Sequence, residues 1–122
     1  MRRERLYLLD ILDAADALNR FVAGKSREEF LTDEVLQSAV LQKLTVIGEA
    51  AARLSRELHA RHPDIEWKEI IGFRNIAVHA YFGMQWPMVW KAATSDAPEL
   101  RPKIERVLAV EFPAEPEQPH NC

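Results

Sequence analysis

Apolar residues recur at steps of three and four positions between residues 4 and 22, which predicts a helix with one buried stripe. The stripe consists of Leu8, Ile11, Leu12, Ala15, Leu18 and Val22. Gly24 favours the left-handed backbone that commonly ends a helix. Ser26 and Glu29 then have the spacing of a capping box, which predicts a short helical turn.

A second helix is predicted from residue 32 to about residue 61, and its apolar stripe alternates steps of four and three. Its members are Val40, Leu44, Ile47, Ala51, Leu54 and Leu58. Such a seam is typical of a helix that lies along a neighbour in a bundle. Asp33 predicts its start and Pro63 its end. Gly48 and the alanines at 50–52 leave space for another helix to approach closely.

The second half of the chain predicts shorter helices. Asp64 is the expected N-cap of a helix over about 65–81. Pro87 has the place of a first-turn proline and predicts a helix that starts at residue 86 or 87. Ser95 or Asp96 is expected to cap a last helix.

No segment alternates apolar and polar residues as half-buried strands do, and only four glycines are present. The pattern therefore predicts an all-α fold, an antiparallel bundle of four or five helices formed by residues 1–110. Residues 111–122 are rich in proline and polar side chains, which predicts a flexible C-terminal tail.

Charge and composition narrow the classes of partner. The 122-residue chain has a net charge of −3, so any RNA contact must come from a local basic patch. Asp10 and Asp13 interrupt the apolar N-terminal segment, unlike in a signal peptide, and no apolar run is long enough to span a bilayer. The single cysteine, Cys122, can form no intrachain disulfide. We therefore expect a cytoplasmic protein with no membrane partner.

Residues 74–82 read RNIAVHAYF and carry polar side chains in an apolar setting. Each residue of a helix turns by about 100°, so Asn75 and His79 share a face, whereas Arg74 and His79 lie about 140° apart. Tyr81 falls near the side of Arg74. A single ideal helix does not bring Arg74 beside His79. Either the helix loosens before Gly83, or long side chains converge at its edge, or a second copy of the chain completes the site. We expect the third, helped by the first.

This stretch resembles the R-x4-H-x-Y motif of the HepT-like branch of the HEPN superfamily. The segments VIGEAAARLS at 46–55, HPDIEWKEIIGFRN at 62–75 and VW at 89–90 are also similar to that branch. The resemblance covers most of residues 4–108. Ala80 departs from the pattern because many relatives have glycine there, but the polar residues are intact.

The resemblance implies a homodimer that acts as a metal-independent ribonuclease toxin, the partner of a nucleotidyltransferase (MNT-type) antitoxin. On this chain it implies that Arg74 and His79 are catalytic in a dimer cleft, with Asn75 in support. It also implies that the antitoxin adenylylates Tyr81 and thereby silences the toxin. No metal and no cofactor are expected.

These residue types suit RNA cleavage. Histidine titrates near neutral pH and can take or give a proton, while arginine stays charged and offers phosphate a planar fork of donors. The rival hypothesis is a non-catalytic protein whose cleft binds a nucleotide or a substrate for the nucleotidyltransferase.

Structural roles remain open for the same residues. His79 can be read as a core histidine with a satisfied hydrogen bond. Arg74 can be read as an ion-pair partner of Asp10 or Asp13, and Tyr81 as a ring that covers the core.

Two other polar groups, and the tryptophans, are weaker candidates. Asp10, Asp13 and Asp16 are better read as a solvated helix face than as a metal site. The segment RLSRELHARH at 53–62 either guides RNA or is ordinary charged surface; its basic residues are Arg53, Arg56, His59, Arg61 and His62. Trp67, Trp86 and Trp90 are expected to pack against neighbours rather than stack on bases.

Overall fold

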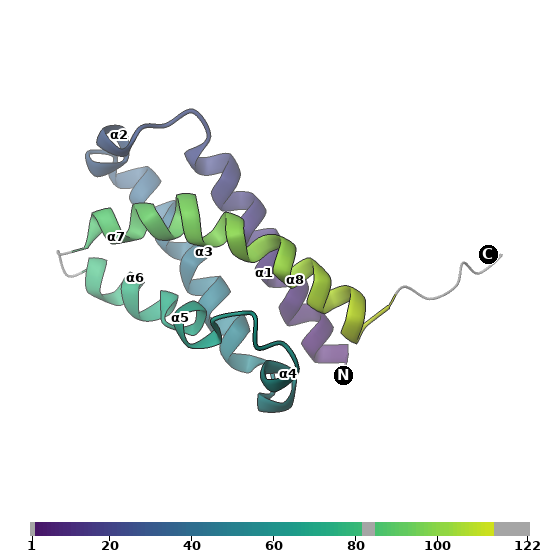
Figure 1. The fold of residues 1–122 in the computed structure, drawn as a ribbon. Helices are drawn as coiled ribbons and strands as arrows, with labels where there is room; N and C mark the ends of the chain where they lie inside the picture. The colour runs from purple at the N-terminus through teal and green to yellow at the C-terminus, as the bar shows by residue number, and fades with distance from the viewer. Residues whose placement is uncertain (1, 82–84, 114–122) are drawn as a thin grey trace.

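The computed structural model describes residues 2–81 and 85–113, apart from the side chains of residues 2, 77, 80 and 81. The described part is a bundle of helices (Figure 1). Its long runs are α1 (Arg2–Val22), α3 (Glu34–Arg53), α5 with α6 (Trp67–Ile71 and Phe73–Tyr81) and α7 with α8 (Trp86–Lys91 and Ala97–Glu111). Short helices α2 (Arg27–Leu31) and α4 (Arg56–Arg61) connect them. The predicted all-α fold is confirmed.

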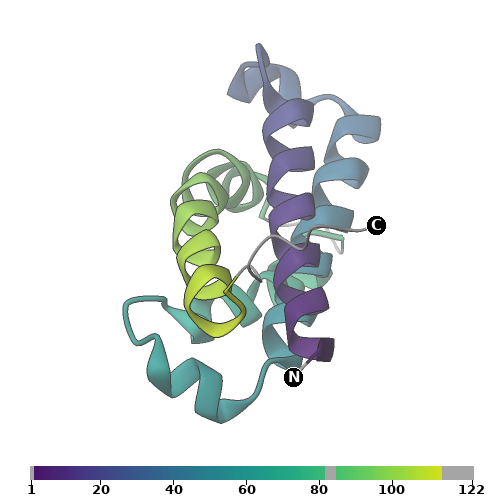
Figure 2. The same cartoon turned by 90° about the vertical axis from the view of Figure 1, so that its right-hand side faces the viewer.

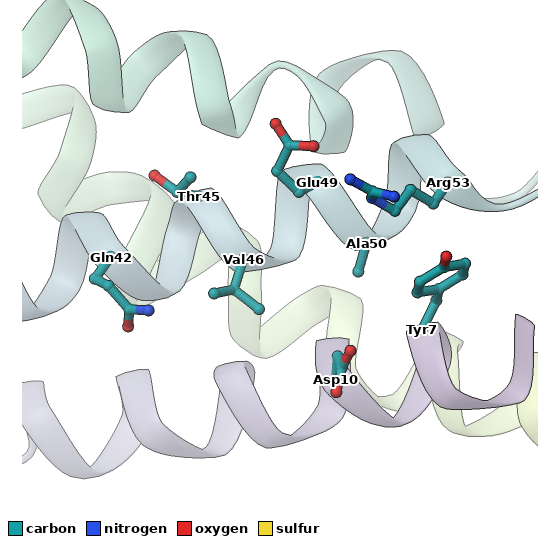
Figure 3. A pocket seen from close by; sticks show the side chains of 8 residues that line it. All are labelled: Tyr7, Asp10, Gln42, Thr45, Val46, Glu49, Ala50 and Arg53. Atoms are coloured by element: carbon teal, nitrogen blue, oxygen red, sulfur yellow. The ribbon is translucent and has the colours of Figure 1, made fainter. Parts of the chain in front are cut away.

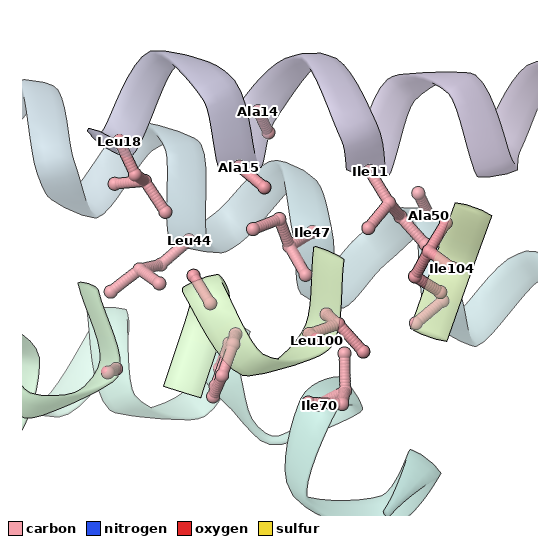
Figure 4. Packing of buried hydrophobic residues seen from close by; sticks show 14 of the residues in the cluster. Ile11, Ala14, Ala15, Leu18, Leu44, Ile47, Ala50, Ile70, Leu100 and Ile104 are labelled. Atoms are coloured by element: carbon pink, nitrogen blue, oxygen red, sulfur yellow. The ribbon is translucent and has the colours of Figure 1, made fainter. Parts of the chain in front are cut away.

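The two predicted apolar stripes meet in one core. Helices α1 and α3 run antiparallel and lie side by side in both views (Figures 1 and 2). Leu18 of α1 and Leu44 of α3 are fully buried between them, and further along the same core Leu100 of α8 lies next to Ile70 of α5 (Figure 4). Burial of each such side chain is worth roughly 1.5–3 kcal/mol, so this core holds the helices in place.

The predicted helix ends around α2 are confirmed. Gly24 adopts φ 73° after α1, a left-handed conformation that only glycine adopts without strain. The Ser26 hydroxyl accepts from the Glu29 backbone N–H at 3.1 Å, and the Glu29 carboxylate accepts from the Ser26 N–H at 2.8 Å. This capping box starts α2, which places Phe30 in the core beneath Trp86 and Trp90.

The predicted second helix is too long, because α3 ends at Arg53. Leu54 is extended, at φ −72° and ψ 148°, and Ser55 becomes the N-cap of α4. The Ser55 N–H, freed from the helix, donates to the carboxylate of Glu4 at 2.7 Å. Leu58 is nevertheless fully buried, so the apolar seam continues across the break.

The helix predicted over 65–81 begins later and is divided. Glu66, not Asp64, occupies the N-cap position of α5, and its side chain makes no capping bond. Buried Trp67 begins the helix, and its indole N–H donates to the carbonyl of His62 at 3.0 Å. Gly72 separates α5 from α6 while keeping a helical backbone.

The last helices are continuous, and Ser95 and Asp96 do not cap a new one. A π-helical turn, η1 (Ala92–Asp96), joins α7 to α8, and the Asp96 carboxylate accepts instead from Lys91 at 3.2 Å. Pro87 lies in the first turn of α7, as predicted. Helix α8 reaches Glu111, and residues 114–122 of the predicted tail lie outside the described part of the chain.

Glu111 joins the end of α8 to the end of α4. Its carboxylate accepts two hydrogen bonds from Arg61, at 2.7 and 2.9 Å, and one from His62 at 2.7 Å. The bonds from Arg61, followed by that from His62, lower the pKa of Glu111 to about 2. Two members of the basic segment are thus engaged in structure.

None of the described helices combines the length and the apolar character needed to cross a membrane.

Candidate functional site

Helix α6 positions the polar residues of the RNIAVHAYF stretch. Phe73, 2% exposed, anchors its first turn in the core, and Ile76 packs against the same core one turn later. The backbone N–H groups of Asn75 and Ile76 both donate to the carbonyl of Gly72, at 2.9 and 3.0 Å. The helix therefore has one buried face, and the remaining positions point to its edge or to solvent.

Arg74 lies at the edge of α6 that faces α3. Its guanidinium Nη1 lies 3.3 Å from Oε2 of Glu49, and the two side chains are 40% and 47% exposed. The pairing with Asp10 or Asp13 of the first helix, considered from the sequence, is wrong, because the partner is on α3. An ion pair this exposed is worth at most about 1 kcal/mol, so a phosphate group can displace the carboxylate.

Gly48 sets the position of Arg74 relative to α3. A Cβ atom at Gly48 would lie 2.8 Å from the backbone nitrogen of Arg74 and 3.1 Å from the carbonyl oxygen of Ile71. The two backbones are therefore in direct contact, and a side chain would force them apart. The predicted close approach at Gly48 is confirmed. The next residue is Glu49, the partner of Arg74, which the sequence analysis did not single out.

His79 and Asn75 lie on the exposed side of α6. The reading of His79 as a core histidine is therefore wrong. Around the helix axis, Val78 lies between Arg74 on one side and Asn75 and His79 on the other, and its side chain is 55% exposed. Arg74 faces α3 while His79 faces solvent, in agreement with the separation of about 140° expected from helix geometry. A single chain does not bring the two residues together.

Tyr81 is the last residue of α6. Its side chain lies outside the described part of the structure, so its role remains a prediction. Seven residues after Arg74, its position falls within about 20° of Arg74 around the helix axis.

The basic segment at 53–62 is largely structural. His59 stacks on Trp67 with 4.5 Å between ring centroids, and its Nε2–H donates to the carbonyl oxygen of Ala51 at 3.0 Å. With Arg61 and His62 bound to Glu111, only Arg53 and Arg56 are left as exposed cations of this segment.

Of the three aspartates of α1, one is bonded to another helix and two are exposed. Asp16 accepts two hydrogen bonds from Arg101 of α8, which lower its pKa, whereas Asp10 and Asp13 are exposed. Among the described residues, no group of three or more His, Cys, Asp or Glu side chains is placed to hold a metal ion.

The fold and the R-x4-H-x-Y helix together define the class of protein: an all-α, HEPN-like bundle with an arginine and a histidine presented on one short helix. The family model described as "Ribonuclease HepT-like" matches residues 11–107, most of the chain. The chain belongs to this HepT-like family.

Relatives of similar length support this membership. A protein of Caldanaerobacter subterraneus subsp. tengcongensis, named as a candidate RNase, is 36% identical over 111 residues, covering 91% of this chain and 99% of its own. The "Probable ribonuclease HepT" of Thermococcus cleftensis is 35% identical over 106 residues, covering 87% and 96%. A candidate RNase of Methanocaldococcus jannaschii is 32% identical over 106 residues, covering 87% and 97%. No solved structure matches the chain.

Gly48→Ala tests whether the backbone contact holds α6 in place. Alanine has the higher helix propensity by about 1 kcal/mol, so propensity alone predicts a more stable protein. We expect instead a loss of about 1–3 kcal/mol in the free energy of unfolding, because the new Cβ pushes Arg74 away from α3. Chemical denaturation measures the difference. Ser38→Ala, at an exposed position of α3, is the control and should change the stability by less than about 0.5 kcal/mol. An unchanged or raised stability in Gly48→Ala would contradict the contact.

Proposed function

We propose that this protein is a metal-independent endoribonuclease, the cytoplasmic toxin of a HEPN/MNT toxin-antitoxin pair. The observation that carries the proposal is the arrangement of α6. In a member of the HepT-like family, this helix presents an exposed histidine, and an arginine whose only described partner is one half-exposed carboxylate. The names of the relatives support RNA as the substrate class.

The proposed reaction uses the nucleophile that RNA itself carries. His79 removes the proton of the ribose 2′-hydroxyl, whose oxygen attacks the adjacent phosphorus. The bond from phosphorus to the 5′-oxygen breaks, and that oxygen takes a proton from His79 of a second copy. The products are a 2′,3′-cyclic phosphate and a free 5′-hydroxyl. Arg74, released from Glu49, donates to the phosphate oxygens and balances the charge that develops on them.

A homodimer follows from the divergence of Arg74 and His79. Val78 lies about 40° from Arg74 around α6, between it and His79, and an exposed valine there suits a surface that a second copy covers. We propose that two such surfaces pair about a twofold axis, so that each arginine lies near the histidine of the other copy. In this arrangement Asn75, next to Arg74, orients His79 or holds a phosphate oxygen.

The first prediction from the proposed function concerns RNA cleavage in EDTA. The wild-type chain should fragment total cellular RNA, and both Arg74→Ala and His79→Ala should lower the rate by about 100-fold or more, since each removes a group needed in the transition state. Arg56→Ala, another exposed arginine, is the matched control and should keep its activity. Gel analysis measures the fragments, and mass spectrometry verifies that Tyr81 is unmodified. Intact RNA with unmodified, dimeric wild type would favour the nucleotide-binding alternative.

A second prediction concerns the dimer. Light scattering should give the wild type twice the 14.0 kDa mass of one chain. Val78→Asp should be monomeric and inactive on RNA, because it buries an unpaired charge at the interface. Val35→Asp is the matched control, since Val35 is 80% exposed on α3, and should remain dimeric and active. A monomeric wild type that cuts RNA would refute the shared site.

A third prediction concerns control by the antitoxin. We propose that the nucleotidyltransferase transfers adenylyl groups from ATP to the phenol oxygen of Tyr81, with release of pyrophosphate. The added phosphate repels RNA from Arg74. Incubation with the antitoxin and ATP should raise the mass by one or a few adenylyl groups and stop cleavage. Tyr81→Phe should resist both effects, whereas Tyr7→Phe, the only other tyrosine, should not. Equal labelling of Tyr81→Phe would place the modification elsewhere.

A further inference from the structure

A groove of about 360 Å³ lies between α1 and α3 (Figure 3). Val46 and Ala50 of α3 and the ring of Tyr7 of α1 line its apolar part. Asp10 and Gln42, both exposed, bring polar groups to its edge. Pockets for small ligands begin at roughly 300 Å³ and combine apolar walls with a few polar groups, so this groove has the size and lining for one planar ring system.

Glu49 connects the groove to the proposed catalytic arginine. Glu49 is among the residues that line the groove, while its carboxylate points away from Tyr7 and Asp10 (Figure 3) and lies 3.3 Å from the guanidinium of Arg74 on α6. A ligand in the groove is therefore one side chain away from the phosphate position proposed at Arg74. Arg53, one turn further along α3, also lines the groove and adds an exposed positive charge. An occupant should accordingly carry both a ring and nearby negative charge, as a nucleotide does.

We propose that this groove binds the guanine base of a nucleotide beside the scissile phosphate, an inference that rests on the proposed ribonuclease function. The Tyr7 ring offers a face for stacking, which by itself accepts any base. The carboxylates supply the selectivity. Guanine presents two adjacent N–H donors on its Watson–Crick edge, and one carboxylate accepts both. Uracil presents a single N–H donor there, between two carbonyl oxygens, so a carboxylate accepts only one hydrogen bond and is repelled by the flanking oxygens.

Asp10 is the residue that reads the base in this arrangement. It is exposed on α1 and has no described ion pair holding it elsewhere, so its two oxygens are available to the N1–H and 2-amino groups. Glu49 is available only after phosphate has taken the guanidinium of Arg74.

The test is the base preference of the full-length dimer on a random-sequence RNA in EDTA, read by sequencing the cut ends. The wild type should enrich guanine at one position adjoining the cut by about tenfold. Asp10→Asn should lose the enrichment while still cutting, because an amide offers one donor and one acceptor in place of two acceptors. Asp13→Asn, exposed on the same helix and outside the groove, is the matched control and should keep it.

Two further measurements separate the alternatives. Inosine lacks the 2-amino group, so replacing the enriched guanosine with inosine should slow wild-type cleavage by about tenfold and leave Asp10→Asn unaffected. Val46→Trp, which fills the groove, should also abolish the preference. Cleavage without base preference, or a preference that persists in Asp10→Asn, overturns the proposal. So does a change from dimer to monomer in Asp10→Asn or Val46→Trp, which would assign the groove to a second copy.

Failure of the ribonuclease function is distinguishable from failure of the groove. Titration of the wild type with 5′-guanosine monophosphate, followed through the Tyr7 ring resonances by NMR, reports on the groove without any cleavage. Binding that exceeds that of 5′-uridine monophosphate, in a chain that leaves RNA intact, would retain the base site and reject the nuclease. Equal or absent binding of the two nucleotides would reject the base site.

Discussion

The contact between the backbones of α3 and α6 at Gly48 fixes the position of Arg74, the first of the candidate site residues. Helix α3 carries the central apolar seam, and α6 enters the core through Phe73, so both partners of the contact are fixed by burial. A Cβ at Gly48 would lie 2.8 Å from the backbone nitrogen of Arg74, which leaves little freedom in how the helices meet. The backbone of Arg74 is therefore held in a fixed position against α3. Glu49, which follows Gly48 on α3, is the residue whose side chain reaches the guanidinium.

The kind of bonding distinguishes Arg74 from Arg61 and Arg101. Arg61 donates twice to Glu111, and Arg101 donates twice to Asp16 and also pairs with Glu105. Such two-pronged bonds use the planar fork that arginine offers and raise the pKa of both guanidinium groups. Arg74 instead meets a single carboxylate oxygen at 3.3 Å. That contact orients the guanidinium but leaves most of its donors for another anion.

Local signals predicted much of the fold, while contacts from distant residues account for the errors. The capping box at Ser26 and the turn at Gly24 act within a few residues, so the sequence reveals them. The break at Leu54 is different, because the Ser55 N–H that leaves the helix is satisfied by Glu4, which is 51 residues away. The apolar seam does not indicate this break in the helix, because Leu54 and Leu58 are both buried as they would be in an unbroken helix.

The same distinction applies to the site. The motif identified Arg74, Asn75 and His79 as polar residues of one helix, and helix geometry predicted their divergence. The partner of Arg74 could not be predicted, because it depends on which helix packs against α6. The π-helical turn at Ala92–Asp96 could not be predicted from the sequence either. Ser95 and Asp96 are residue types that commonly cap helices, yet the helix continues past them.

Glu49 has a special position in the proposed function because it lies between two features that one substrate would occupy. Its carboxylate pairs with Arg74, and the same residue lines the groove together with Tyr7 and Asp10. His79 faces away from both, so a chain that binds RNA at Arg74 and in the groove still lacks a proton carrier at the phosphate. In the proposed function, binding and chemistry are therefore divided between two copies, and cleavage requires the proposed dimer. Because the separation of Arg74 and His79 follows from helix geometry, changes elsewhere in one chain cannot restore the site while α6 remains helical.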